Sequence, residues 1–257
     1  MRTHWFWSHH LFSDQFIFAL TRYCRAVSDP PVLLVHGFGT SFESTWRHNG
    51  WVDLLEDAGR SVIGVDLLGH GSAPKPTDPE AYRDLEERIL LELPDRPVDA
   101  IGFSAGGVAL LWLAAHYPDR FRRLVVAGVG RGSLNDADER RLEIVEAVRS
   151  GLARTPELRY FADLPEASGQ GEHVREALTA FLSRPDRRTL SPEILARIVV
   201  PVLVVLGDQD FAGPALPLVE ALPSGNYQEL RGVDHFATPK DFGFLDAALR
   251  FLDIDAF

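Results

Sequence analysis

Residues 102–106 read Gly-Phe-Ser-Ala-Gly, a Gly-x-Ser-x-Gly pattern. The mostly apolar run 98–101 before it predicts a strand, and the apolar run 107–113 after it predicts a helix. A sharp turn between a strand and a helix lifts a serine clear of the sheet, and the helix N-terminus favours negative charge beside it. Glycine at both ends suits such a turn, because the backbone packs closely there. We therefore predict that Ser104 is a nucleophile.

A serine nucleophile needs a base within hydrogen-bond reach and a carboxylate that orients the base. His235 follows the last expected strand, and the carboxyl ends of parallel strands share one sheet edge, so we expect His235 beside Ser104. The loop after the expected strand 201–206 carries Asp208 and Asp210. We predict Asp210 as the acid, because Asp208 follows the strand closely enough to hold the turn instead.

The intermediate of an acyl transfer also needs two hydrogen-bond donors for its oxyanion. The Ala105 N–H directly follows Ser104 and is the first expected donor. Residues 36–39, His-Gly-Phe-Gly, follow the apolar run 31–35, and the Phe38 N–H is the expected second donor. Neither a G-x-G-x-x-G motif nor a P-loop lysine is present, so this loop is not expected to bind phosphate.

The chain alternates between apolar strands and helices, which predicts an α/β fold with a doubly wound, mostly parallel sheet. Strands are expected at 16–23, 31–35, 61–65, 97–101, 121–127, 201–206 and 227–230. Helices are expected at 46–58, 80–93, 105–116, 135–153, 156–162, 172–183, 216–222 and 241–252. Three helices follow one another without a strand, so we predict a core domain at 1–130 and 199–257, interrupted by a helical cap at 131–198.

The net charge of −11 comes from 26 basic and 37 acidic residues, and it argues against nucleic acid or an anionic membrane as the main partner. Cys24 is the single cysteine, which rules out an intrachain disulfide and a cysteine zinc cluster and fits a cytoplasmic protein. No metal-ligand spacing or cofactor motif is present, so we expect no metal and no cofactor. No segment is long and apolar enough to predict a membrane span.

In sequence order, these motifs resemble the α/β-hydrolase superfamily, over about residues 31–252. The motifs are His-Gly-Phe-Gly at 36–39, Asp-Leu-Leu-Gly-His-Gly-Ser at 66–72, Gly-Phe-Ser-Ala-Gly-Gly at 102–107, Gly-Asp-Gln-Asp at 207–210 and Asp-His-Phe at 234–236. The resemblance implies a Ser104, Asp210 and His235 triad with an oxyanion hole at Phe38 and Ala105.

Two further positions follow from the same resemblance. His70 matches a family position near the sheet edge, and we expect its role to be structural. A serine at the elbow argues against the haloalkane dehalogenase and epoxide hydrolase branches, which place aspartate there. The two aspartates of residues 207–210 depart from a single-acid motif, so Asp208 is the alternative to Asp210 as the acid.

The expected activity is hydrolysis of a small or medium carboxylic ester through an acyl-enzyme. A carbon–carbon bond hydrolase, a lactonase, a lyase or an acyltransferase would use the same residues, and a catalytically silent ligand-binding protein would share the fold. The expected partner is a small molecule with an apolar acyl or alcohol group. The expected cap lining is Leu142, Val145, Leu152, Leu158, Tyr160, Phe161, Phe181 and Leu182. The arginines 131, 154, 187 and 188 are expected to be solvated.

Overall fold

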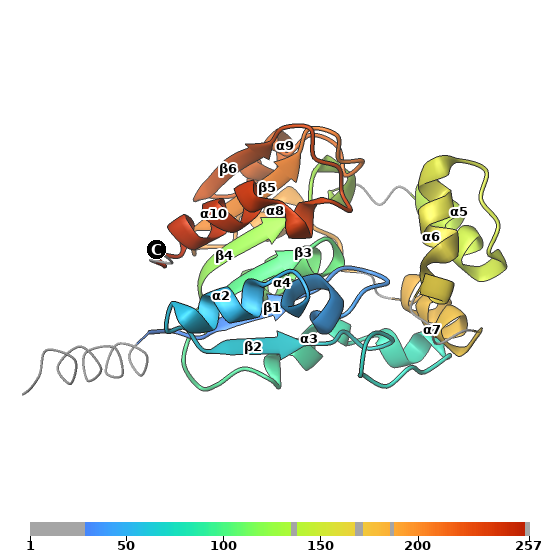
Figure 1. The fold of residues 1–257 in the computed structure, drawn as a ribbon, viewed down its shortest axis with the longest axis horizontal. Helices are drawn as coiled ribbons and strands as arrows, with labels where there is room; N and C mark the ends of the chain where they lie inside the picture. The colour runs from blue at the N-terminus through green and yellow to red at the C-terminus, as the bar shows by residue number, and fades with distance from the viewer. Residues whose placement is uncertain (1–28, 135–137, 168–171, 186–187, 255–257) are drawn as a thin grey trace, which may run out of the picture.

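The computed structural model describes residues 29–134, 138–167, 172–185 and 188–254 (Figure 1). The strand predicted at 16–23 lies outside the described residues. The described strands form one parallel sheet in the order β2-β1-β3-β4-β5-β6. They are β1 Val32–Val35, β2 Val62–Val65, β3 Val98–Phe103, β4 Phe121–Ala127, β5 Val202–Gly207 and β6 Gly225–Leu230.

The strand order reverses at β1, which lies between β2 and β3. Such a reversal opens a crevice at the carboxyl ends of the strands, where ligands bind in open α/β sheets. The predicted fold class, a doubly wound parallel sheet, is therefore confirmed. The strand expected at 61–65 forms one edge of the sheet, and only Val65 of β2 is buried.

Helices cover both faces of the sheet, because alternate residues of each strand point to opposite sides. Leu33 and Val35 face one layer, formed by α3, α4, α8 and α9. Val32 and Leu34 face the other layer, formed by α2 and α10. The helix bounds are α2 Trp51–Asp57, α3 Leu85–Leu90, α4 Ala105–His116, α8 Pro192–Leu195, α9 Leu216–Ala221 and α10 Phe242–Phe251.

Two predicted helices are interrupted in the structure. The segment 46–58 begins as a π-helix at Glu43–Arg47, and α2 starts only after Gly50, whose φ of 80° no helix accommodates. The segment 80–93 divides into a 3-10 helix and α3. The described 3-10 helices are η2 Pro79–Tyr82, η3 Pro118–Arg120, η4 Arg131–Ser133 and η5 Thr238–Lys240.

Three of the helices between β4 and β5 stand to one side of the sheet (Figure 1). They are α5 Asp138–Ser150, α6 Pro156–Ala167 and α7 Glu172–Leu182. They share a small core of Val148, Phe161, Leu164, Val174 and Leu178. The division into core and cap at residues 131 and 198 stays a prediction.

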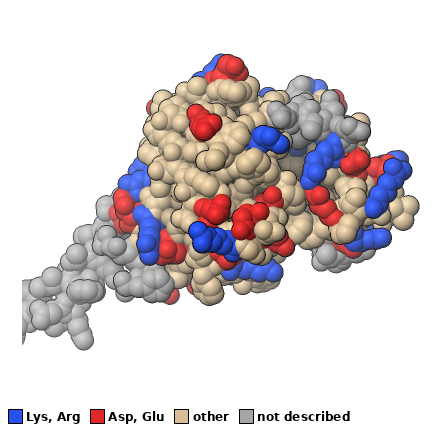
Figure 2. Space-filling view, turned by 90° about the horizontal axis from the view of Figure 1, so that it is seen from above, with Lys and Arg blue, Asp and Glu red and all other residues tan. Residues whose placement is uncertain are grey.

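Acidic and basic side chains are interspersed on the face shown in Figure 2. On α5 and α6 they form ion pairs, among them Arg140 with Glu157 and Arg159 with Asp163. Exposed pairs of this kind contribute little to stability, about 1 kcal/mol at most. In the described part of the chain, no helix combines the length and apolar character needed to cross a bilayer.

Candidate active site

Ser104 occupies a strained turn between β3 and α4. Its φ of 51° and ψ of −116° are rare for a residue with a side chain. Its backbone N–H donates to the Ala127 carbonyl oxygen at 2.8 Å, which anchors the turn to β4. A Cβ atom on Gly102 would lie 2.8 Å from the Gly106 carbonyl carbon, and one on Gly106 would overlap the Val35 carbonyl. The two glycines of the pattern are therefore required by close backbone packing.

Three predicted site residues meet at the carboxyl edge of the sheet. The Nε2 atom of His235 lies 3.0 Å from the Ser104 hydroxyl oxygen. The Nδ1 atom of His235 lies 2.9 and 3.0 Å from the carboxylate oxygens of Asp210. Because a carboxylate only accepts, Nδ1 carries the proton, and the lone pair of Nε2 faces the hydroxyl. Asp210 and His235 are both buried, which shields this chain of hydrogen bonds from water.

The neighbouring aspartates have other partners. Asp208 accepts a hydrogen bond from the Gly232 N–H at 2.7 Å and holds that turn. Asp234 accepts from the Phe236 N–H at 3.0 Å, in the turn that follows it. Of the two acids in residues 207–210, it is Asp210 that the structure places against the imidazole.

Aromatic rings that the sequence analysis did not assign surround the imidazole of His235. The rings of Phe103 and Phe211 lie 4.9 and 4.3 Å from it, centroid to centroid, and Phe236 presents its edge at 5.4 Å. Tyr160 of α6 stacks on Phe236 at 3.4 Å. The helices beside the sheet thus contact the loop that carries His235. Two of these rings have a signal in the sequence, because Phe211 directly follows Asp210 and Phe236 directly follows His235.

The loop 36–39 is fastened by the buried side chain of His36. Its Nδ1 contacts the Gly37 carbonyl oxygen at 2.7 Å, and its Nε2 accepts from the Leu67 N–H at 3.0 Å. Burial lowers the pKa of His36, so the ring stays neutral and keeps this pair of contacts. The loop therefore holds Phe38 beside the elbow, while the Phe38 ring packs against Phe181 at 5.5 Å.

Some expectations about the cap lining are wrong. Leu142 and Leu152 are 58% and 72% exposed, so they point to solvent and not into a site. Phe161 and Phe181 are buried, and both rings contact Phe38. When most of a helix is polar, as in α5, its sequence does not reveal which of the few apolar residues face inward.

The expectation that Arg188 is solvated is also wrong. Its guanidinium lies 4.3 Å from the Trp112 ring centroid and donates to Glu87 at 2.9 Å. Its side chain is 21% exposed. Arg131 and Arg154 are exposed, as expected, and Arg187 lies outside the described residues.

This geometry can be compared with known proteins. The family described as alpha/beta hydrolase fold matches residues 30–193, so the chain belongs to that family and is a hydrolase of the α/β fold. A pimeloyl-[acyl-carrier protein] methyl ester esterase from Neisseria meningitidis serogroup C is 34% identical over 211 residues, which cover 71% of this chain and 76% of the relative.

A second relative is named for a lactone. The 3-oxoadipate enol-lactonase 2 of Acinetobacter baylyi is 29% identical over 203 residues, covering 70% of this chain and 72% of the relative. Among solved structures, NosK from Streptomyces actuosus matches with a TM-score of 0.68 and 21% identity, over 88% of this chain and 100% of that one. At this identity the structural match supports the fold alone.

Proposed function

We propose that this hydrolase cleaves a small or medium carboxylic ester through a triad and an acyl-enzyme. Ser104 is the nucleophile, His235 the general base and Asp210 the group that orients the base. The Phe38 and Ala105 backbone N–H groups form the oxyanion hole. The observation that carries the proposal is the continuous chain from the Asp210 carboxylate through the imidazole to the Ser104 hydroxyl.

The reaction follows from this order of donors and acceptors. As the Ser104 oxygen attacks the ester carbonyl carbon, its proton moves to the Nε2 atom of His235. The negative oxygen of the tetrahedral intermediate accepts hydrogen bonds from the Phe38 and Ala105 N–H groups. Ala105 is the first residue of α4, so its N–H has no intrahelical partner and is free for this role. When the intermediate collapses, the C–O bond to the alcohol breaks, and His235 returns the proton to the leaving alkoxide.

The acyl-enzyme is released by the same groups acting on water. His235 takes a proton from a water molecule, whose oxygen attacks the acyl carbon. The second intermediate expels Ser104, which regains its proton from Nε2. Both half-reactions need His235 to be unprotonated at Nε2 when attack begins, and the Asp210 contact at Nδ1 favours that tautomer.

The substrate is proposed to be a neutral ester with an apolar acyl group and a small alcohol. The Neisseria relative, named for a pimeloyl methyl ester, supports an ester with a small alcohol. The helices α5 to α7, proposed as a cap, bring aromatic side chains to the carboxyl edge of the sheet, as Tyr160 of α6 does at Phe236. A cytoplasmic location stays a prediction.

Lactone opening is the second candidate activity, and the Acinetobacter relative favours it. The same triad would attack the ring ester, but the alcohol would remain attached to the acyl group. A lactone therefore gives one product where an open ester gives two. Hydrolysis of a carbon–carbon bond, the other alternative, would use the same three side chains.

The proposal is tested by steady-state hydrolysis of p-nitrophenyl and methyl esters of graded chain length, beside a panel of lactones. We expect turnover of esters with an optimum at short or medium chains, and loss of turnover in Ser104→Ala and in His235→Ala. Ester turnover near the wild-type rate in either folded variant would overturn the triad. Turnover of lactones alone would replace the ester by the lactone as the substrate.

A further inference from the structure

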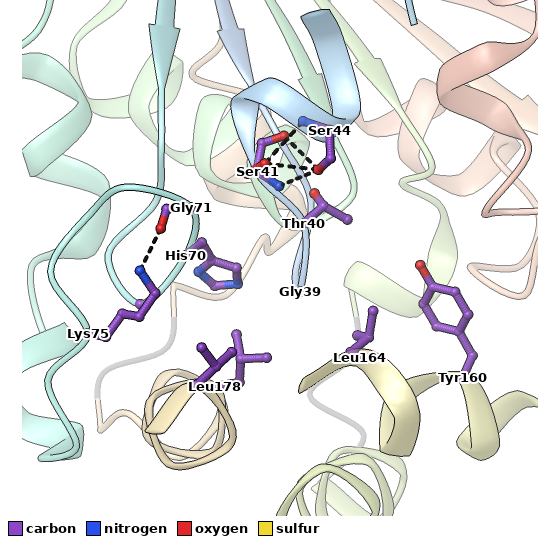
Figure 3. A pocket seen from close by; sticks show the side chains of 12 residues that line it. Gly39, Thr40, Ser41, Ser44, His70, Gly71, Lys75, Tyr160, Leu164 and Leu178 are labelled. Carbon is purple, nitrogen blue, oxygen red and sulfur yellow. Dashed lines mark hydrogen bonds between the residues drawn. The ribbon is translucent and has the colours of Figure 1, made fainter. Parts of the chain in front are cut away.

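A cavity of about 380 Å³ opens beside the loop that carries Phe38 (Figure 3). Gly39, the residue after Phe38, lines the cavity. Leu164 packs so closely against Gly39 that a Cβ atom would not fit there. The cavity also reaches Tyr160, which stacks on the neighbour of His235. The cavity therefore adjoins the elements that hold the proposed triad and oxyanion hole.

The cavity has one apolar and one polar wall. Leu164, Val174 and Leu178 of α6 and α7 form the apolar wall. Hydroxyl groups of the loop after β1 and the residues around His70 form the polar wall (Figure 3). An alkyl chain fits the first wall, while the second offers hydrogen bonds to a polar group on that chain.

His70 contributes an unused acceptor to the polar wall. The residue is 3% exposed, and its Nδ1 lies 3.1 Å from the Leu68 carbonyl oxygen, so Nδ1 carries the proton. Its Nε2 then bears a lone pair, and this atom has no hydrogen-bond partner among the described residues. The ring projects into the space above Leu178 (Figure 3). A buried acceptor without a partner is costly, and a ligand donor would relieve that cost.

The groups around His70 determine which kind of ligand group can donate a hydrogen bond to its Nε2 atom. Burial lowers the pKa of His70 to about 3, so the ring is neutral and can only accept at Nε2. The positive charge of Lys75 lowers that pKa further and would repel a cationic ligand. Lys75 donates to the Gly71 and Ala73 carbonyl oxygens at 2.5 and 3.1 Å, which occupies two of its three N–H groups. A neutral hydroxyl fits these surroundings, because it donates a hydrogen bond without carrying a positive charge.

We propose that this cavity is the acyl-chain subsite and that His70 accepts a hydrogen bond from a neutral hydroxyl group on the chain. The preferred substrate class is then a hydroxyacyl ester. The inference rests on the proposed ester hydrolysis and adds to it the residue that distinguishes hydroxylated from plain chains. His70 touches the chain and not the reacting carbon, so it determines specificity.

The test compares matched p-nitrophenyl esters of ω-hydroxyalkanoic and alkanoic acids, from short to medium chains. For wild type we expect one chain length at which kcat/KM for the hydroxy ester exceeds that for the plain ester by about tenfold, the value of one neutral hydrogen bond. His70→Asn keeps an amide donor near Leu68 but removes the Nε2 acceptor, so we expect that ratio to fall to about one.

A matched control comes from His116, an exposed residue whose Nδ1 lies 2.7 Å from the Trp112 carbonyl oxygen. His116→Asn is expected to keep the wild-type ratio. The proposal is overturned if wild type prefers the plain ester at every chain length, or if His70→Asn retains the preference for the hydroxy ester.

A second measurement separates this proposal from the proposed function. The ¹⁵N resonance of His70 Nε2 is followed as hexanediol is added to the wild-type protein. A saturable shift that is absent with hexane supports the hydroxyl subsite, even if no ester is hydrolysed. If Nε2 does not respond to the diol, the subsite is refuted, even if plain esters are hydrolysed.

Discussion

The substitution Asp210→Asn probes the acid of the proposed triad. Oδ1 of Asp210 accepts from the Ala212 N–H at 2.8 Å, so the oxygen of an asparagine amide keeps that position. The amide NH₂ then takes the Oδ2 position, 2.9 Å from the Nδ1 atom of His235. Two donors cannot face each other there, so the imidazole proton moves to Nε2, where it points at Ser104 and removes the base.

The expected loss follows from this tautomer change. A serine triad with the corresponding substitution elsewhere loses about 10⁴-fold in kcat, which corresponds to about 5 kcal/mol of transition-state stabilisation. Here the contact between Asp210 and His235 is buried, so solvent cannot replace the carboxylate. We therefore expect kcat on the best ester to fall by a similar factor while KM changes little.

The matched control is Asp208→Asn. Asp208 bonds the Gly232 N–H and not the imidazole, and an asparagine oxygen can keep that bond. Stopped-flow and steady-state assays on one ester would compare the two variants after circular dichroism has shown both to be folded. We expect at most a few-fold loss for Asp208→Asn. A larger loss in this variant than in Asp210→Asn would refute the assignment of the acid.

Two further predictions concern stability. Burial lowers the pKa of His36 and of His70, the latter to about 3, whereas histidine in the unfolded chain titrates near 6.5. The unfolded state therefore binds more protons below about pH 6.5, so the free energy of unfolding should fall as the pH drops. His70 alone should lower it by about 2 kcal/mol at pH 5. Urea titrations that give equal stability at pH 7 and pH 5 would contradict this. The buried Trp51 indole donates to the Pro239 carbonyl oxygen at 2.8 Å, so Trp51→Phe should cost about 2 to 3 kcal/mol in urea unfolding, and a cost below about 0.5 kcal/mol would show that this contact is not structural.

The sequence predicts best the elements whose pattern is uninterrupted. The helix expected at 105–116 and the strand expected at 121–127 have the same bounds as α4 and β4, because a continuous apolar run fixes the helix and the apolar run 124–127 fixes the buried part of the strand. The helix expected at 46–58 is broken, because Gly50 takes a left-handed conformation that the apolar spacing does not reveal. Arg188 is half-buried because Glu87 and Trp112, far from it in sequence, receive it.

The same distinction holds for the candidate site. Ser104, His235 and Asp210 could be grouped from the sequence, because parallel strands bring their carboxyl ends to one edge. The rings around His235 come from separate strands, loops and helices, so only the packed chain reveals them. The lone pair of His70 is likewise invisible in the sequence, since it depends on the Leu68 carbonyl that fixes the tautomer.

The most direct test of the central claim is the intact mass of the protein after treatment with a fluorophosphonate. An activated serine oxygen forms a P–O bond as the P–F bond breaks and fluoride leaves. The triad predicts one adduct per chain, mapped by peptide analysis to Ser104 and absent from folded Ser104→Ala. No adduct on the wild-type protein, or an adduct that persists in the variant, would contradict the claim that Ser104 is the activated nucleophile.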